Sequence, residues 1–383
     1  MTEQAKVPAI RFAGFTDPWE QRKLGDVASS FDYGLNAAAT EYDGQNKYLR
    51  ITDIDDETHE FSKSDLTTPL ADLAMSADYL LKEGDLLFAR TGASVGKTYL
   101  YRQFDGMVYF AGFLIRARIG EGADPEFAYQ ATLTDAYKKY VAITSQRSGQ
   151  PGVNAQEYAD YQLMLPSKTE QQQIGMTLRS LDDLITLHQR KYDKLVIFKK
   201  SMLEKMFPKD GESVPEIRFA GFTDPWEQRK FSEIVDVCSG RDYKHLDEGP
   251  IPVYGTGGYM TSVSEALSHN RDAIGIGRKG TIDKPYLLKA PFWTVDTLFY
   301  AIPKSDINLE FALCSFLNVD WKSKDESTGL PSLSKESINE TVLSVPNVVE
   351  QNHLGNFFAD LDRLITLHQR KRLSIRQRSP VWS

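Results

Sequence analysis

The sequence predicts an α+β fold in which two similar α/β domains are separated by two long helices that form an antiparallel coiled coil. The first observation is that RFAGFTDPWEQRK occurs at residues 11–23 and again at 218–230. The second is that LDDLITLHQRK at 181–191 returns as LDRLITLHQRK at 361–371. The third is that the first pair is offset by 207 positions and the second by 180. The ends of the unit are therefore nearly fixed while its interior has changed, as expected of a tandem pseudo-repeat.

Composition limits the class of protein. A chain of 383 residues is long enough for two or three domains, each with its own core. The net charge of −8 argues against a free-standing, nonspecific nucleic-acid binder but allows base-specific contact by local basic loops. No apolar run approaches the roughly 20 residues that span a bilayer, and no signal peptide is recognisable. Cys238 and Cys314 suggest neither a disulfide framework nor a zinc site, so we expect a cytoplasmic protein.

Each repeated entry segment reads as an irregular stretch in which glycine and Asp-Pro force turns. A strand-rich domain follows each one, with short runs that include YLRITDI, DLLFAR, KTYLY and FLIRARI in the first and IPVYGTGGY, AIGIG, KPYLL and TLFYAI in the second. A helix is predicted over 125–141 in the first domain and over 309–317 in the second. We place the first domain, with its N-terminal segment, at 1–166 and the second at 210–346.

The helices are predicted at 167–209 and, in a shortened form, at 347–383. Apolar residues step by four and three alternately along both, which is the seam of a coiled coil. Two matched seams most simply pair with each other; the alternative is two unrelated amphipathic helices that each cover their own domain. The seam residues are Ile174, Leu178, Leu181, Ile185, His188, Tyr192 and Leu195 in the first helix, and Leu354, Phe358, Leu361, Ile365, His368 and Ile375 in the second.

The helix ends also carry signals. Ser167 precedes Glu170 by three residues, as Asn347 precedes Glu350, and both pairs predict a capping box. The first helix should end before Pro208. The second loses its apolar seam after Ile375 and meets Pro380. Although His188 and His368 could be read as a metal pair, no cysteine or carboxylate cluster accompanies them, so we expect packed side chains and no metal site.

One loop suggests nucleotide binding but departs from the required pattern. Residues 92–98, GASVGKT, have three residues between the glycines where a phosphate-binding loop has four. The stretch YLYRQF that follows predicts a strand, not the helix that would hold a phosphate. RTGASVGK at 90–97 aligns instead with RKGTIDK at 278–284, and both read as polar tips suited to contact with phosphates and base edges.

A second paired feature is the Gly-x-Pro turn that ends QRSGQP at 146–151 and ESTGLP at 326–331. Ordinary solvated turns remain the alternative for all four loops. The GTGG sequence at 255–258 has no glycine-rich equivalent in the first unit, where residues 47–51 occupy its place. The candidate DNA-contacting residues are Arg90, Thr91, Ser94, Lys97, Gln146, Arg147, Ser148, Arg278, Lys279, Lys284, Ser327 and Thr328.

No catalytic motif is recognisable: the sequence has no Asn-Pro-Pro-Tyr motif, helicase set, nuclease cluster or nucleophile elbow. No catalytic residue and no cofactor is therefore predicted for the chain itself. The pattern favours a binding component. A nucleotide hydrolase using residues 92–98, and a coiled-coil scaffold whose end domains bind protein or carbohydrate, are the alternatives.

These features resemble the specificity (S) subunit of type I restriction-modification systems over nearly the whole chain. The resemblance rests on PWEQRKLGD and PWEQRKFSE, the TGLPSLS turn, and the helix PSKTEQQQIG…LDDLITLHQRK. It implies two target recognition domains that each read half of a split double-stranded DNA target, separated by two conserved helices. It also implies two modification subunits that methylate adenine with S-adenosylmethionine, and restriction subunits that use ATP and Mg. The S subunit itself is noncatalytic.

Transferred to this chain, the resemblance assigns residues 178–191 and 361–371 to the conserved helices, as scaffold and as contacts for modification subunits. Residues 90–97 and 278–284 match loops of the recognition domains. Because the two interiors differ in sequence, the expected target is asymmetric and not palindromic.

Overall fold

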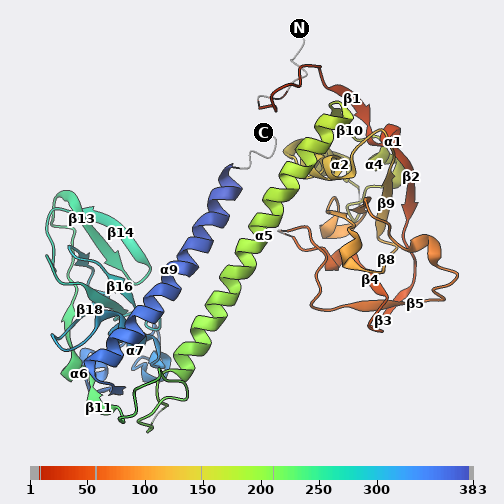
Figure 1. The fold of residues 1–383 in the computed structure, drawn as a ribbon. Helices are drawn as coiled ribbons and strands as arrows, with labels where there is room; N and C mark the ends of the chain where they lie inside the picture. Colours follow the sequence, from red (N-terminus) through yellow and green to blue (C-terminus); the bar gives the residue numbers. More distant parts are fainter. Residues whose placement is uncertain (1–7, 9, 57, 148, 210, 379–383) are drawn as a thin grey trace. The chain divides into compact units, whose positions relative to one another are not determined.

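The computed structural model describes residue 8 and residues 10–56, 58–147, 149–209 and 211–378, with side chains described as far as 374. The chain divides into two compact units, one of Met1–His188 with Lys371–Ser383 and the other of Gln189–Arg370 (Figure 1). Because this division passes through both long helices, it does not test the boundaries predicted at 166, 209 and 346. Each unit is described by itself below.

The first unit contains a four-stranded antiparallel sheet of order β2-β9-β6-β7, with β2 at its edge. One face of the sheet packs Phe88 and Ile115 against the helices, and the other packs Leu87 beneath Phe110. The strands are β1 (Glu20–Lys23), β2 (Ala28–Tyr33), β3 (Ala38–Glu41), β4 (Lys47–Leu49), β5 (Thr67–Leu70), β6 (Asp85–Ala89), β7 (Thr98–Leu100), β8 (Val108–Phe110), β9 (Leu114–Ile119) and β10 (Gln162–Leu165). The helices are α1 (Leu24–Val27), α2 (Pro125–Ala131), α3 (Asp135–Thr144), α4 (Ala155–Ala159) and α5 (Lys168–Lys205), of which the residues to 188 belong here.

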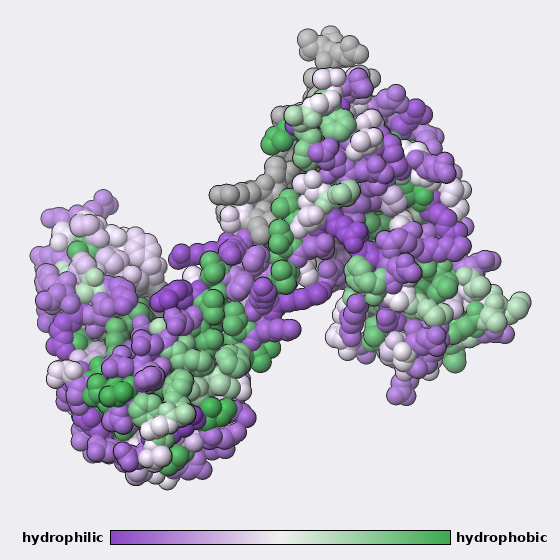
Figure 2. All heavy atoms as spheres, in the orientation of Figure 1, coloured by the Kyte–Doolittle hydropathy of each residue, from purple (hydrophilic) through white to green (hydrophobic). Residues whose placement is uncertain are grey.

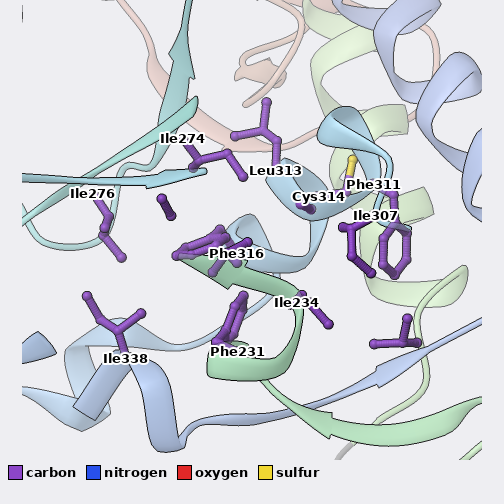
Figure 3. Packing of buried hydrophobic residues seen from close by; sticks show 14 of the residues in the cluster. Phe231, Ile234, Ile274, Ile276, Ile307, Phe311, Leu313, Cys314, Phe316 and Ile338 are labelled. Atoms are coloured by element: carbon purple, nitrogen blue, oxygen red, sulfur yellow. The ribbon is translucent and has the colours of Figure 1, made fainter. Parts of the chain in front are cut away.

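The second unit repeats this sheet in the order β12-β18-β15-β16 and adds a three-stranded sheet β14-β13-β17. In its core the Phe231 and Phe316 rings lie 4.4 Å apart between their centroids (Figure 3). The strands are β11 (Glu227–Lys230), β12 (Val235–Ser239), β13 (Glu248–Gly255), β14 (Gly258–Val263), β15 (Ala273–Gly277), β16 (Tyr286–Leu288), β17 (Trp293–Thr294), β18 (Leu298–Pro303) and β19 (Val342–Val345). The helices are α6 (Phe231–Ile234), α7 (Leu309–Leu317), α8 (Lys335–Glu340) and α9 (Val348–Arg378), of which the residues to 370 belong here.

In both domains a glycine lies in unusually close contact with a second main-chain segment, and no sequence motif predicts this contact. A Cβ added to Gly34 would lie 2.1 Å from the Ala111 carbonyl oxygen, and one added to Gly240 would lie 2.0 Å from that of Val295. Each glycine also donates from its N–H at 3.1 Å, to Leu114 in the first domain and Leu298 in the second. Only glycine fits so close a backbone approach, so the same residue type is required at the matching position of both domains.

Two predicted elements of the first domain are wrong. The helix predicted over 125–141 is two helices, because Thr134 caps a new one by accepting a hydrogen bond from Tyr137 N–H at 3.3 Å. The strand predicted through YLRITDI stops at Leu49. A 3₁₀ turn follows at Ile51–Asp53, where Asp53 accepts two hydrogen bonds from the Arg50 guanidinium at 2.8 and 2.9 Å.

The start of each long helix is locked to its entry segment by a buried, bidentate ion pair. Arg11 donates to both Glu170 oxygens at 2.6 and 2.7 Å, and Arg218 donates to both Glu350 oxygens at 2.7 and 2.8 Å. The predicted capping boxes are therefore half right. Ser167 and Asn347 accept from the N–H groups of the two glutamates, at 3.4 and 3.0 Å, but the glutamate side chains bind arginine instead of the capping residue.

A glutamine beside each glutamate joins the helix to the neighbouring short helix. The Gln171 amide accepts from Asp124 N–H at 2.9 Å, just before α2, and donates to the Pro166 carbonyl. Gln351 does the same with Asn308, just before α7, and with Pro346, both at 3.0 Å. The entry strands complete the joint, since β1 pairs with β10 and β11 with β19.

Within the second unit, α5 and α9 pack together in antiparallel directions. Lys199 binds both Asp362 carboxylate oxygens at 2.6 and 2.8 Å. Phe207, which comes after Lys199 in the chain, packs on Phe358, which comes before Asp362, so the two segments run in opposite directions. The predicted seam faces inward: Leu354, Phe358 and Leu361 are buried in the core of this unit, and Leu195 packs on the same core. In the first unit, Ile174 and Leu178 pack on the core of the first domain.

The remaining seam positions, Leu181, Ile185, His188, Tyr192, Ile365 and His368, are partly buried. The side chain of Ile375 and residue Pro380 lie outside the described part. The first helix ends at Lys205, before Pro208 as predicted, and has 38 residues, whereas the described part of α9 has 31.

Replacing Arg218 by methionine should lower the free energy of unfolding by about 3–5 kcal/mol, because Glu350 would remain as a buried, unpaired carboxylate. Adding Glu350→Gln should restore part of the loss. The measurement is chemical denaturation of the full chain followed by circular dichroism. Arg229→Met is the matched control, because Arg229 pairs with a half-exposed Asp306 at 3.2 Å and should contribute less than about 1 kcal/mol. Equal losses for Arg218→Met and Arg229→Met would contradict this account.

Candidate nucleic-acid interface

Three loops of the first domain meet at the C-terminal end of β6, and we call them the first loop cluster: residues 90–97, 111–113 and 146–153. Arg90 lies between the other two, because its N–H donates to the Phe113 carbonyl at 3.0 Å and its own carbonyl accepts from Val153 at 2.9 Å. Gly92 N–H donates to the Pro151 carbonyl at 3.0 Å. The structure thus brings together the two polar loops that the sequence singled out separately.

The second loop cluster, residues 278–284, 295–297 and 327–333, is built by the same main-chain bonds. Arg278 N–H donates to the Thr297 carbonyl at 2.8 Å, and the Arg278 carbonyl accepts from Leu333 at 3.0 Å. Gly280 N–H donates to the Pro331 carbonyl at 2.8 Å. Because these bonds use backbone groups, the two clusters form them although most of their side chains differ.

In the first cluster, the Arg90 guanidinium lies between two half-exposed aromatic rings. Its carbon is 5.1 Å from the centroid of the Tyr33 ring and 5.9 Å from that of Phe113. Its Nε donates to the Gly112 carbonyl at 3.1 Å. The arginine is therefore held in place by cation–π contacts and one hydrogen bond, with the rest of its donor set available.

The other predicted residues of this cluster differ in their contacts. The Lys97 ammonium pairs with Asp56, and the Arg147 guanidinium binds Glu157. Thr91 and Ser94 are partly exposed and Gln146 is exposed, while Ser148 lies outside the described residues.

Cations are more available in the second cluster. Arg278, Lys279 and Lys284 are exposed, and none of the three forms an ion pair within the described part of the chain. Arg278 donates only weakly, to the Asp296 carbonyl at 3.4 Å, and lies over the Phe299 ring. Thr328 is exposed, whereas Ser327 is tied to Asp325 at 2.8 Å.

A buried tyrosine supports the first cluster from below. Tyr158 donates its hydroxyl hydrogen to the Ala89 carbonyl at 2.7 Å and accepts from Gly96 N–H at 3.2 Å, so it spans the loop at 90–97. A tyrosine hydroxyl is protonated at neutral pH and can donate, and burial raises the pKa of Tyr158 further above that range. The loop is followed by strand β7, as predicted, and not by the helix of a nucleotide-binding loop.

Sequence reasoning missed three parts of this surface. The loops at 111–113 and 295–297 carry no polar motif, and only the pairing of the strands in the sheet shows that they lie beside the predicted polar loops. Phe113 begins the predicted strand run FLIRARI, and Tyr33 lies in no motif that the sequence analysis singles out. The GTGG sequence was noticed, but not the exposed Tyr259 and Met260 that directly follow it.

The first domain also has a charged cavity of about 570 Å³ along β2, beside Tyr33. Arg116 is buried there, donates to Asp32 at 2.8 Å, and its Nε has no hydrogen-bond partner among the described residues. Burial opposes ionisation of Asp32, but hydrogen bonds from Arg116 and Ser30 outweigh it and lower the pKa of this carboxyl. The second domain places Tyr300 and Cys238 at the matching positions, so the charges are not part of the common scaffold.

No group of three or more histidine, cysteine, aspartate or glutamate side chains in the described ranges could hold a metal ion. None of the helices in those ranges is long and apolar enough to cross a membrane. His188 and His368 are both partly buried on their helices.

A family model, the type I restriction modification DNA specificity domain, matches residues 16–196 and 223–377. The chain therefore belongs to this family, with one match over each repeat. It is 22% identical over 236 residues to the type I restriction enzyme MjaVIII specificity subunit of Methanocaldococcus jannaschii, covering 60% of this chain and 52% of that relative. It is 24% identical over 219 residues to the putative MjaX specificity subunit of the same organism, covering 55% and 51%.

The chain thus spans about half the length of these curated relatives. The fold is also similar to the crystal structure of a type I restriction-modification system S subunit from M. genitalium. That likeness has a TM-score of 0.67 at 17% identity, and covers 97% of this chain and 95% of the other.

Proposed function

We propose that this chain is the noncatalytic DNA-recognition subunit of a type I restriction-modification complex. Each domain reads one half of a split, asymmetric target with its loop cluster. The observation that carries the proposal is that two clusters with the same main-chain hydrogen bonds hold different side chains. Such a pair suits two different half-sites presented by one duplicated scaffold.

The side chains of the clusters support DNA as the ligand. Arginine recognises guanine through two parallel hydrogen bonds in the major groove, and lysine neutralises phosphates. Arg90 is held by its aromatic neighbours with donors to spare, and Arg278 and Lys279 are exposed. Since the net charge is −8, much of the phosphate neutralisation would come from partner subunits.

The long helices offer a repeated surface for those partners. Leu184 and Leu187 on α5 are 43% and 44% exposed, and their counterparts Leu364 and Leu367 on α9 are 43% and 42% exposed. Apolar side chains also gather over the parts of α5 and α9 that lie in the second unit (Figure 2). A surface repeated once per helix fits two copies of one partner, which we take to be the modification subunit.

The remaining parts of the complex follow from the same proposal. The modification subunits bind S-adenosylmethionine, and the restriction subunits use ATP and Mg, so this chain needs no cofactor of its own. Its contribution is to choose the DNA sequence and to position the partners on it.

Arg278→Ala and Lys279→Ala should weaken DNA binding in different ways. Loss of Arg278 should cost about 1–3 kcal/mol on the specific target only, by relaxing one half-site. Loss of Lys279 should weaken binding to all sequences and reduce the dependence of log K on log salt concentration by about one. The measurement is a salt series of duplex binding by the chain assembled with its modification subunits.

Lys289→Ala is the matched control. Lys289 is exposed and pairs with Asp272 at the start of β15, whereas Arg278 follows the other end of the same strand. This variant should bind like the parent. If Arg278→Ala and Lys279→Ala also bind like the parent at every salt concentration, the second loop cluster is not the DNA interface.

The double variant Leu184→Asp with Leu187→Asp should lose one of two bound modification subunits. A charge placed in a packed apolar contact should lower the affinity for that subunit at least tenfold, on the order of the loss of one interface hot spot. The pair Leu364→Asp and Leu367→Asp should remove the other. Native mass spectrometry measures the stoichiometry, with the exposed Leu70→Asp on β5 as the control. Full complexes in both leucine variants would show that the partners bind elsewhere.

A further inference from the structure

The hairpin of β13 and β14 in the second domain ends in a narrow tip that carries two exposed apolar side chains. Gly255 pairs with Gly258 across the turn formed by Thr256 and Gly257. Gly258 has a φ of +105°, which favours glycine. Tyr259 and Met260 follow immediately and are 63% and 53% exposed. The tip therefore has a tight, glycine-rich turn and carries exposed apolar side chains.

Met260 owes its position to a β-bulge. Tyr254 pairs with Tyr259 and Val253 with Thr261, so Met260 is the extra residue on its strand and has no partner opposite. Its sulfur lies where a side chain on Gly255 would begin, since a Cβ added there would be 2.6 Å away. Bulges re-aim side chains and are common beside functional sites. Here the bulge and a glycine together hold a methionine over the tip.

The tip is anchored to the second loop cluster. The Tyr286 hydroxyl donates to the Gly255 carbonyl at 2.6 Å from below the turn. Val295, in the cluster, donates from its N–H to the Tyr254 carbonyl at 3.0 Å, and the same loop accepts from Arg278 N–H two residues later. The loop at 295–297 therefore links the strand of the hairpin to Arg278 through main-chain hydrogen bonds.

The described residues of the first domain form no glycine hairpin at the matching place. Its strand β4 ends at Leu49, whose carbonyl accepts from Ala111 N–H at 2.9 Å just as that of Tyr254 accepts from Val295. The chain then turns into Ile51–Asp53, closed by the Arg50–Asp53 ion pair, in place of a glycine hairpin. The hairpin is therefore a property of one recognition domain and not of the scaffold that the two share.

We propose that the β13–β14 hairpin enters the major groove of the target duplex, where Tyr259 and Met260 contact base edges of the half-site read by the second domain. The major groove, about 12 Å wide, admits a two-stranded β-ribbon, and apolar side chains there recognise the thymine methyl group. The glycine-rich turn lets the backbone approach the duplex closely. This inference rests on the proposed function and adds to it the segment and residues that read one half-site.

The test uses the chain assembled with its modification subunits and duplexes in which each base pair of the target is changed in turn. The variant Tyr259→Ala with Met260→Ala should bind the target at least roughly tenfold more weakly and lose discrimination at one or more positions of one half-site only. Its affinity for nonspecific DNA should not change. Val342→Ala, which removes a comparably exposed side chain from β19, should behave like the parent.

A second measurement keeps the proposal testable if the double variant is less stable. Tyr259→p-benzoylphenylalanine should crosslink to the half-site on irradiation, and the same replacement at Leu70 should not. Provided that the parent complex binds a split target, unchanged discrimination by the double variant or the absence of a crosslink from position 259 would overturn the inference. If the parent complex bound no specific target, the proposed function itself would fail.

Discussion

The buried arginine–glutamate pair at the start of each long helix is the interaction on which the rest of the architecture depends. Arg11 and Arg218 reach back from irregular entry segments to Glu170 and Glu350, which are almost fully buried. Without the arginine, each glutamate would be a buried carboxylate that has lost its charge partner, so the pair ties the entry segment to the start of the helix. The duplicated RFAGFTDPWEQRK and the duplicated helix are thus two parts of one joint.

The joint and the loop clusters are stabilised in different ways. The loop clusters are closed by backbone hydrogen bonds, so sequence can change there at little cost, as RTGASVGK and RKGTIDK show. The joint depends on particular side chains and has changed little between repeats. This separation explains how one duplicated unit can carry an arginine between aromatic rings in one domain and free surface cations beside a glycine hairpin in the other.

The sequence was sufficient for the repeat, the two long helices and the apolar seam along them, because these are periodic or literally duplicated. It was not sufficient where tertiary contacts decide the outcome. Thr134 splits a predicted helix by capping a new one, and the Glu170 side chain binds an arginine 159 positions away instead of the backbone of its capping residue. The sequence indicates the two polar loops of each cluster, but their meeting follows from sheet topology, and the position of Met260 depends on a bulge that no local pattern marks.

The most direct measurement is single-molecule methylation sequencing of cells that express this chain with its modification subunit. The account predicts an adenine-methylated motif that is split into two unlike halves, because two unlike loop clusters stand on one scaffold. A continuous or palindromic motif would contradict the assignment of one half-site to each domain. An assembled complex that methylates no defined sequence would contradict the role in DNA recognition.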